Sequence, residues 1–242
     1  MRLLIASDAH GDVNATRLLR ESYALERPDF LVHLGDMVDG QTANASTSLR
    51  ALLAAASGPR WLILGNHDEE ALPASEILRI AGQPRASRVL QNDAAALYFL
   101  DRRDWWSVVE SRVNATGPAL AFIHEPLPQY ALPRRELVEP VSPAESDDSL
   151  WPMLRQRGVV ATFAGHDHLN SDCGRWSGVW LCYAGSLGGY GRDDAPGACN
   201  ATTLPGGCAR RVRVVDVTPT SITTWARLAG GARTQERVLW RA

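Results

Sequence analysis

Short apolar runs alternate with polar turns along the first third of the chain. Three runs, at residues 2–7, 30–34 and 61–64, have the length and aliphatic composition of buried strands. Between them lie two amphipathic segments: residues 13–26, and a second helix that we expect Thr47 or Ser48 to cap and Gly58-Pro59 to end. This repeat of strand, polar turn and helix predicts a layered α/β domain.

The apolar runs continue to the end of the chain. They predict strands at 95–101, 119–123 and 159–164 and helices around 75–82 and over 149–157, whereas residues 104–116 fit neither pattern. The proline-rich segment 126–148 reads as a surface loop. The last runs alternate apolar and polar residues and predict antiparallel strands that complete a second sheet, at 179–183, 212–217, 222–228 and 237–240. We expect residues 1–242 to form one domain.

Composition narrows the class of protein. The hydrophobic fraction of 45% and the charged fraction of 21% are those of a soluble globular protein. A net charge of −2 provides no field that would attract long nucleic acid or an anionic membrane. No apolar run reaches the roughly 18–20 residues of a membrane span, and residues 1–6 are too short for a signal peptide. We therefore expect no membrane partner and no long nucleic acid as partner, and no signal peptide within this chain.

The cysteines and glycosylation sequons favour an oxidising compartment. The four cysteines form two C-x8-C pairs, so we predict the local disulfides Cys173–Cys182 and Cys199–Cys208, with buried free thiols as the alternative. Four asparagines head N-x-[ST] triplets: Asn14, Asn44, Asn114 and Asn200. Together these features predict a secreted protein, or one directed to the secretory pathway or vacuole.

Polar side chains follow five of the apolar runs at the point where each run ends. They are Asp8 and His10, Asp36, Asn66 and His67, His124, and His166 and His168, and they include all histidines except His33. If these strand ends meet at one side of a sheet, the side chains share one crevice. Imidazoles with carboxylates suit zinc, manganese or iron, and the set is too large for one ion. The sequence therefore predicts two metal ions, about 3.5–4 Å apart, that share a carboxylate.

The ordered motifs D-x-H, G-D-x-x-D, G-N-H-D, a histidine after a strand, and G-H-D-H resemble those of the calcineurin-like metallophosphoesterase family. Blocks at 124–130, 165–186, 210–217 and 222–228 are similar to the purple acid phosphatase-like branch of that family. The resemblance implies a four-layer α/β/β/α sandwich of two mixed sheets flanked by helices. It assigns one metal to Asp8, His10, Asp36 and His168, and the other to Asp36, Asn66, His124 and His166. It also implies that His67 faces the phosphate.

The activity that the resemblance implies is hydrolysis of a small phosphomonoester by in-line attack of metal-bound hydroxide. Two divalent ions would lower the pKa of a shared water and hold the phosphate oxygens, while His67 would meet charge on the leaving oxygen. We expect Asp68 to orient His67 by accepting a hydrogen bond from its other ring nitrogen. Two residues depart from the branch. Asp39 stands where the coloured enzymes have a metal-binding tyrosine, and His10 stands where they have a residue that does not bind metal. We therefore expect no tyrosinate-to-iron absorption band.

Several residues also have a simpler structural interpretation. His33 fits a hydrogen-bonded strand histidine, Asp12 and Asp39 fit turn or helix caps, and Trp105-Trp106 fits core packing. Two other functions remain open at this point. One is a phosphodiesterase acting on small or cyclic nucleotides, and the other is a binding scaffold of the same fold without turnover; such a scaffold would be expected to have lost metal ligands or His67.

Overall fold

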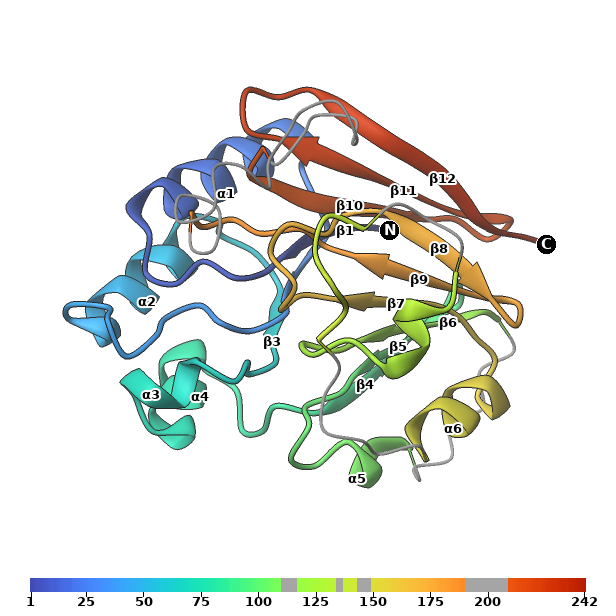
Figure 1. Ribbon diagram of the computed structural model, residues 1–242, viewed down its shortest axis with the longest axis horizontal. Helices are drawn as coiled ribbons and strands as arrows, with labels where there is room; N and C mark the ends of the chain where they lie inside the picture. Colours follow the sequence, from blue (N-terminus) through green and yellow to red (C-terminus); the bar gives the residue numbers. More distant parts are fainter. Residues whose placement is uncertain (110–116, 134–136, 143–148, 190–208) are drawn as a thin grey trace.

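Two mixed sheets packed face to face, with helices on their outer sides, form the protein (Figure 1). The computed structural model describes residues 1–109, 117–133, 137–142, 149–189 and 209–242. Each sheet has six strands. The arrangement confirms the predicted four-layer α/β/β/α sandwich.

The first sheet has the strand order β12-β11-β10-β1-β2-β3. β1 pairs in parallel with β2, β2 in parallel with β3, and β10 antiparallel to β1. The strands of this sheet are β1 (Arg2–Ala6), β2 (Phe30–His33), β3 (Arg60–Leu62), β10 (Arg211–Val217), β11 (Ser221–Leu228) and β12 (Arg233–Arg241).

The second sheet has the order β4-β5-β6-β7-β9-β8. Its centre is parallel, because β5, β6, β7 and β9 pair in parallel, and its two edge strands run antiparallel. The strands of this sheet are β4 (Arg88–Gln91), β5 (Ala96–Phe99), β6 (Ala119–Phe122), β7 (Val159–Ala164), β8 (Cys173–Trp176) and β9 (Val179–Tyr183).

Helices cover the outer faces of both sheets. Asp12 caps α1 by accepting a hydrogen bond from the Asn14 amide at 2.7 Å, which confirms its interpretation as a cap. The helices are α1 (Val13–Glu26), α2 (Ala45–Ala54), α3 (Asp68–Ala71), α4 (Ala74–Ala81), α5 (Trp106–Val109) and α6 (Leu150–Gln156), with a 3-10 turn, η1, at Pro128–Ala131. None of the helices in these described ranges has the length and hydrophobicity to cross a bilayer.

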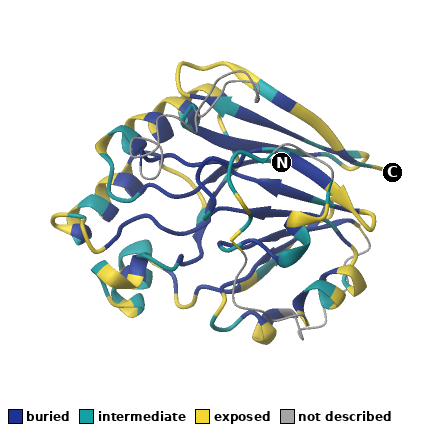
Figure 2. Cartoon of the chain, viewed as in Figure 1, coloured by how far each residue is buried: buried dark blue, intermediate teal, exposed yellow. Residues whose placement is uncertain are grey.

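Strands that are apolar on both faces contribute to three buried apolar clusters. Figure 2 shows that the central strands are buried along most of their length. In β1, Leu4 and Ala6 pack under α1 and α2, whereas Leu3 and Ile5 face the other sheet. A third apolar layer joins the outer face of the second sheet to α5 and α6. Because successive side chains of a strand point to opposite faces, a continuous apolar run is what a strand between two layers requires.

Two sequence-based expectations were wrong. The second helix begins at Ala45 with Asn44 as its cap residue, rather than at Thr47 or Ser48. The C-terminal strands do not complete a second sheet together: β9 joins β7, while β10, β11 and β12 extend the first sheet beside β1. Alternation tells which face of a strand is buried but does not specify the neighbouring strand.

The disulfide Cys173–Cys182 is confirmed, linking paired residues of β8 and β9 whose Cα atoms are 4.0 Å apart. The predicted pair Cys199–Cys208 and the sequons at Asn114 and Asn200 lie outside the described residues. Among the described sequons, Asn44 is exposed and Asn14 is half-buried.

Candidate metal centre

The predicted site residues gather at the carboxyl ends of strands from both sheets. β1, β2 and β3 are followed by Asp8 and His10, Asp36, and Asn66 and His67, and β6 and β7 by His124, His166 and His168. The backbone around these residues is unusual. Among the described non-glycine residues with positive φ are Asp8, His10, Asp36 and His166, with φ of 54°, 47°, 52° and 68°. Residues held in this region cluster at functional sites, because the surrounding structure has to impose the conformation.

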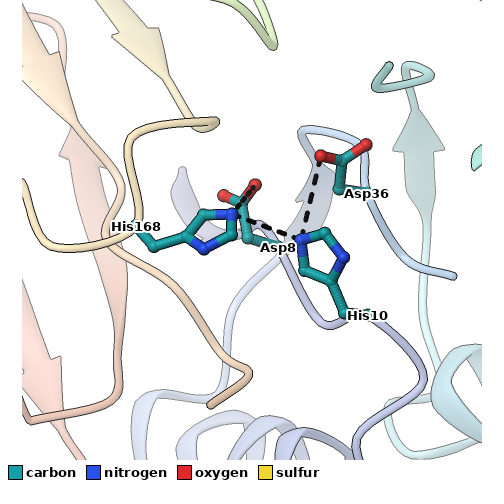
Figure 3. A group of neighbouring side chains, drawn as sticks. All are labelled: Asp8, His10, Asp36 and His168. Atoms are coloured by element: carbon teal, nitrogen blue, oxygen red, sulfur yellow. Dashed lines mark hydrogen bonds and ion pairs between the residues drawn. The ribbon is translucent and has the colours of Figure 1, made fainter. Parts of the chain in front are cut away.

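The first ligand group consists of Asp8, His10, Asp36 and His168, whose nearest ligand atoms all lie within 4.8 Å of one another. Figure 3 shows these four side chains pointing toward one shared space. The His10 Nε2 atom is 3.2 Å from His168 Nε2 and 3.8 Å from Asp36 Oδ2. The His168 Nε2 atom is 3.4 Å from Asp8 Oδ1. These are the residues assigned to the first metal.

The second ligand group consists of Asp36, His124 and His166, again with ligand atoms within 4.8 Å of one another. The His124 Nε2 atom is 3.2 Å from Asp36 Oδ2 and 3.0 Å from Asn66 Oδ1. Asn66 therefore joins this group through its amide oxygen. Asp36 belongs to both groups, as a carboxylate shared by two metals would.

The hydrogen bonds within the site fit metal binding. His124 Nδ1 lies 2.7 Å from the Leu34 carbonyl oxygen, which can only accept, so this nitrogen carries the proton. In the neutral ring Nε2 then has a lone pair, yet it faces the oxygens of Asp36 and Asn66. Asp36 Oδ2 is buried and has no hydrogen-bond partner in the described part of the chain. A cation at this point satisfies all of these atoms, and imidazole, carboxylate and amide ligands suit zinc, manganese or iron.

His10 is held in the same way. Its Nδ1 atom lies 3.1 Å from Asp39 Oδ2, so Nδ1–H donates to this carboxylate and Nε2 turns to the ligand group. Asp39 also accepts from the Gln41 amide at 3.0 Å and the Thr42 hydroxyl at 2.8 Å. Its interpretation as a turn cap was therefore correct but incomplete. The D-x-x-D spacing was the sequence signal for its second role.

The electrostatics of the site favour a positive charge. Burial opposes protonation of His124, but the adjacent Asp36 carboxylate outweighs burial and raises the pKa of His124 to about 10. Burial likewise opposes ionisation of Asp8, but the hydrogen bond and charge of His168 keep the pKa of Asp8 below its ordinary value. Burial lowers the pKa of His10 and of His166, which favours the neutral, ligating form. Ionised carboxylates and neutral imidazoles are what a divalent metal requires.

Asp68 does not have the role expected for it. Its buried carboxylate accepts hydrogen bonds from the backbone amides of Asp36, Met37 and Gly65, each at 2.8 Å. Burial, reinforced by the charge of Asp36, raises the pKa of Asp68 to about 6. Asp68 thus ties the loop after β2 to the loop after β3 and positions the shared ligand.

Glu70 is the carboxylate that orients His67. Its Oε1 atom lies 2.8 Å from His67 Nδ1, and its Oε2 accepts from the Gly40 amide at 3.2 Å. The expectation for Asp68 was wrong because an i,i+3 pair on a helical turn meets, whereas adjacent residues diverge. The His67 side chain is 27% exposed beside His10, with ring centroids 5.4 Å apart, so it borders the ligand groups and remains open to solvent.

Two motif glycines allow the loops to approach closely. A Cβ atom on Gly65 would overlap the Asp36 carboxylate, and one on Gly165 would overlap the Ser7 hydroxyl. These positions explain physically why the G-N-H-D and G-H-D-H motifs begin with glycine. Asp167 is also buried, and its carboxylate accepts hydrogen bonds from the Tyr183 hydroxyl and the Ser142 amide.

Known proteins share this sequence and architecture. The family profile described as calcineurin-like phosphoesterase matches residues 1–170. An Arabidopsis thaliana protein named probable inactive purple acid phosphatase 14 is 29% identical, over 85% of this chain and 67% of its own length. A dimetal phosphatase from Danio rerio superposes with a TM-score of 0.69 at 13% identity, covering 100% of this chain and 99% of that chain. The structure titled GAP50, the anchor in the inner membrane complex of Plasmodium, gives a TM-score of 0.68 at 13% identity, covering 100% and 89%.

The structural likeness establishes the fold, and the profile match spans most of the chain together with all the ligand residues. The similarity to the Arabidopsis thaliana protein agrees with the resemblance of the C-terminal blocks to the purple acid phosphatase-like branch. The chain belongs to the calcineurin-like phosphoesterase family.

Proposed function

We propose that this protein is a dinuclear metal-dependent phosphohydrolase that hydrolyses small phosphomonoesters. The observation that carries the proposal is the shared carboxylate: Asp36 lies in both ligand groups, and His10 and His124 turn their Nε2 atoms toward it. Family membership supports phosphoesterase chemistry in general. The preference for monoesters and the turnover itself belong to the proposal.

Two divalent ions held by these ligand groups would supply an activated water and bind the phosphate oxygens. Around them, Asp39 and the Leu34 carbonyl fix the orientation of His10 and His124. Asp68 fixes the backbone that presents Asp36. His67, held at Nδ1 by Glu70, donates from Nε2 in its protonated form to the leaving oxygen as the phosphorus–oxygen bond breaks.

A binding scaffold without turnover is the second candidate. It is favoured by the name of the Arabidopsis thaliana relative, which describes that protein as probably inactive. The composition of the site favours an enzyme, because every ligand and His67 are present and gathered together. A phosphodiesterase acting on small or cyclic nucleotides would use the same ligands and would differ in its preferred substrates.

Metal analysis followed by a substrate panel tests the proposal. We expect about two metal ions per chain, reversible loss of activity on chelation, and faster hydrolysis of phosphomonoesters than of diesters. Faster diester hydrolysis would favour the phosphodiesterase. Two bound metals with no turnover on any ester would favour the scaffold, and full activity in metal-free protein would refute the dinuclear mechanism.

We also propose passage through an oxidising compartment. The buried disulfide Cys173–Cys182 and the exposed sequon at Asn44 support it. A mobility shift on glycosidase treatment of the protein from its native host is the expected result, and unglycosylated protein isolated from the cytosol would contradict the proposal.

A further inference from the structure

A small apolar cavity adjoins the second ligand group. It has a volume of about 90 Å³, and the His124 ring forms part of its wall. Leu64, two residues before the ligand Asn66, forms another part. The cavity therefore lies at the carboxyl ends of β3 and β6, and the His124 ring borders both the cavity and the position assigned to a metal.

Most of the other described residues in the wall are apolar. Leu100, Trp105, Ile123 and Leu150 line the cavity, and all four are buried members of the apolar layer outside the second sheet. The cavity volume corresponds to about three water molecules at roughly 30 Å³ each, and is smaller than the roughly 150 Å³ of an apolar cavity that admits benzene. It fits a short alkyl chain or the edge of an aromatic ring.

Apart from the His124 ring, the charged residues of the described lining are Arg102 and Glu125. Arg102 Nη1 lies 2.8 Å from Glu125 Oε1, and the Arg102 side chain is 49% exposed. This pair lies where the lining meets solvent, so the buried walls offer little to a polar ligand and favour an apolar one. Trp105, expected from sequence to be a core residue, is one of these walls, whereas its neighbour Trp106 is exposed.

We propose that this cavity binds the organic group of the phosphoester while the phosphate is held at the ligand groups. The substrates would then be esters that carry a short alkyl chain or an aromatic edge next to the phosphate. This inference rests on the proposed function, because it places the phosphate at Asp36 and His124. Burial of apolar surface in the cavity adds affinity in proportion to the area removed from water.

Non-hydrolysable phosphonates test the proposal without a leaving-group effect. Titration calorimetry on the metal-loaded protein compares methylphosphonate with butylphosphonate. We expect butylphosphonate to bind roughly 10- to 50-fold more tightly, since each buried methylene adds up to about 0.8 kcal/mol. Leu150→Phe, which fills the cavity, should reduce this ratio to within about twofold.

Leu154 provides a matched control. It lies one turn after Leu150 on α6 and belongs to the same apolar layer, but it is not part of the cavity wall. Leu154→Ala should keep the preference for butylphosphonate, whereas Leu150→Ala should shift it toward hexylphosphonate.

The outcomes separate the two proposals. Equal binding of methyl- and butylphosphonate, with ester hydrolysis intact, would overturn the cavity proposal alone. Tighter binding of butylphosphonate that is unchanged in Leu150→Phe would also overturn it, because the alkyl chain would then bind elsewhere. A preference for butylphosphonate without hydrolysis of any ester would support the cavity and refute the phosphohydrolase. Failure of both phosphonates to bind would refute both.

Discussion

Two regions of this protein bury many polar groups, and they do so in opposite ways. Around Arg213, every guanidinium nitrogen has an acceptor: Nε donates to the Tyr183 carbonyl at 2.6 Å, Nη1 to the Thr224 hydroxyl at 3.4 Å, and Nη2 to Gln235 Oε1 at 3.2 Å. In the metal centre, by contrast, the Asp36 carboxylate faces the Nε2 atoms of His10 and His124, and its Oδ2 atom has no hydrogen-bond partner among the described residues. Arg213 and Asp36 are fully buried, and His124 is 5% exposed.

The difference distinguishes a structural network from a ligand site. The protein alone satisfies the Arg213 network, although burial lowers the pKa of Arg213 to about 9. In the metal centre the described residues leave Asp36 Oδ2 without a partner, and a cation between the two ligand groups would satisfy it, so this geometry favours a binding role. Unmatched buried acceptors that converge on one point are therefore the more informative sign of function.

The strongest way to break the metal centre is to remove its shared carboxylate. Asp36→Ala should reduce metal content and abolish activity together, because both ligand groups lose a member. Metal content per folded chain, measured by mass spectrometry beside kcat, checks this. Asp216→Ala, at a partly exposed carboxylate in β10, should change neither.

His67 separates catalysis from metal binding. His67→Gln should keep metal content and lower kcat on alkyl phosphates by roughly 10²–10⁴-fold, with a smaller loss on nitrophenyl phosphate, whose leaving group needs little protonation. Glu70→Gln should cost about tenfold, because it acts only through the orientation of His67. Loss of metal in His67→Gln would show instead that His67 is a ligand.

Breaking the Arg213 network should affect stability rather than chemistry. Arg213→Met leaves the Tyr183 and Ser171 carbonyls without their donor, so the free energy of unfolding should fall by roughly 3–5 kcal/mol. Metal content per folded chain should stay unchanged. Urea unfolding measures the loss. Arg175→Met, at an exposed position, is the control, and its free energy of unfolding should stay within about 0.5 kcal/mol of the wild-type value. Equal losses in both variants would contradict the structural role of the network.

His33 represents a third kind of buried polar group, because neither ring nitrogen has a hydrogen-bond partner among the described residues. The expectation of a hydrogen-bonded strand histidine was therefore wrong. Burial, assisted by the charge of Arg60, lowers the pKa of His33 from 6.5 to about 3. The buried His33 ring therefore stays neutral, and no hydrogen bond from the described residues offsets the burial of its nitrogens.

At neutral pH the effect of His33→Leu should be the smallest of these, within about 1 kcal/mol, because an unpaired polar group is replaced by an apolar one. Between pH 6.5 and 3 the unfolded chain binds a proton at His33 that the folded protein does not. The free energy of unfolding is therefore unaffected by His33 protonation above pH 6.5. Below pH 6.5 it falls by roughly 1.4 kcal/mol per pH unit because of this residue. Between pH 7 and pH 5 the wild type should lose about 2 kcal/mol of its free energy of unfolding that His33→Leu does not lose. Unfolding measurements at the two pH values check this, and parallel pH profiles of the two proteins would contradict it.

Much of the fold and most of the site followed from local pattern. The apolar runs predicted β1, β2 and β7 within a residue or two, because a strand buried on both faces has to be apolar throughout. The histidines and carboxylates after these runs were identified as ligands, because the ends of parallel strands meet at one edge of a sheet. The disulfide Cys173–Cys182 also followed from close spacing along the chain.

Contacts between distant segments were decided only in three dimensions. The choice between Asp68 and Glu70 as the partner of His67 depends on how the loop after β2 packs against the loop after β3, and Asp68 is already bonded to backbone amides about 30 residues away. Packing between distant segments also decided three other features: the placement of β10 beside β1, the absence of a described hydrogen-bond partner for His33, and the cavity beside His124. Sequence by itself determined which residues are buried and which carry chemistry, since these depend on residue type and period. The tertiary structure decided which of them touch, since that depends on packing between elements far apart in the chain.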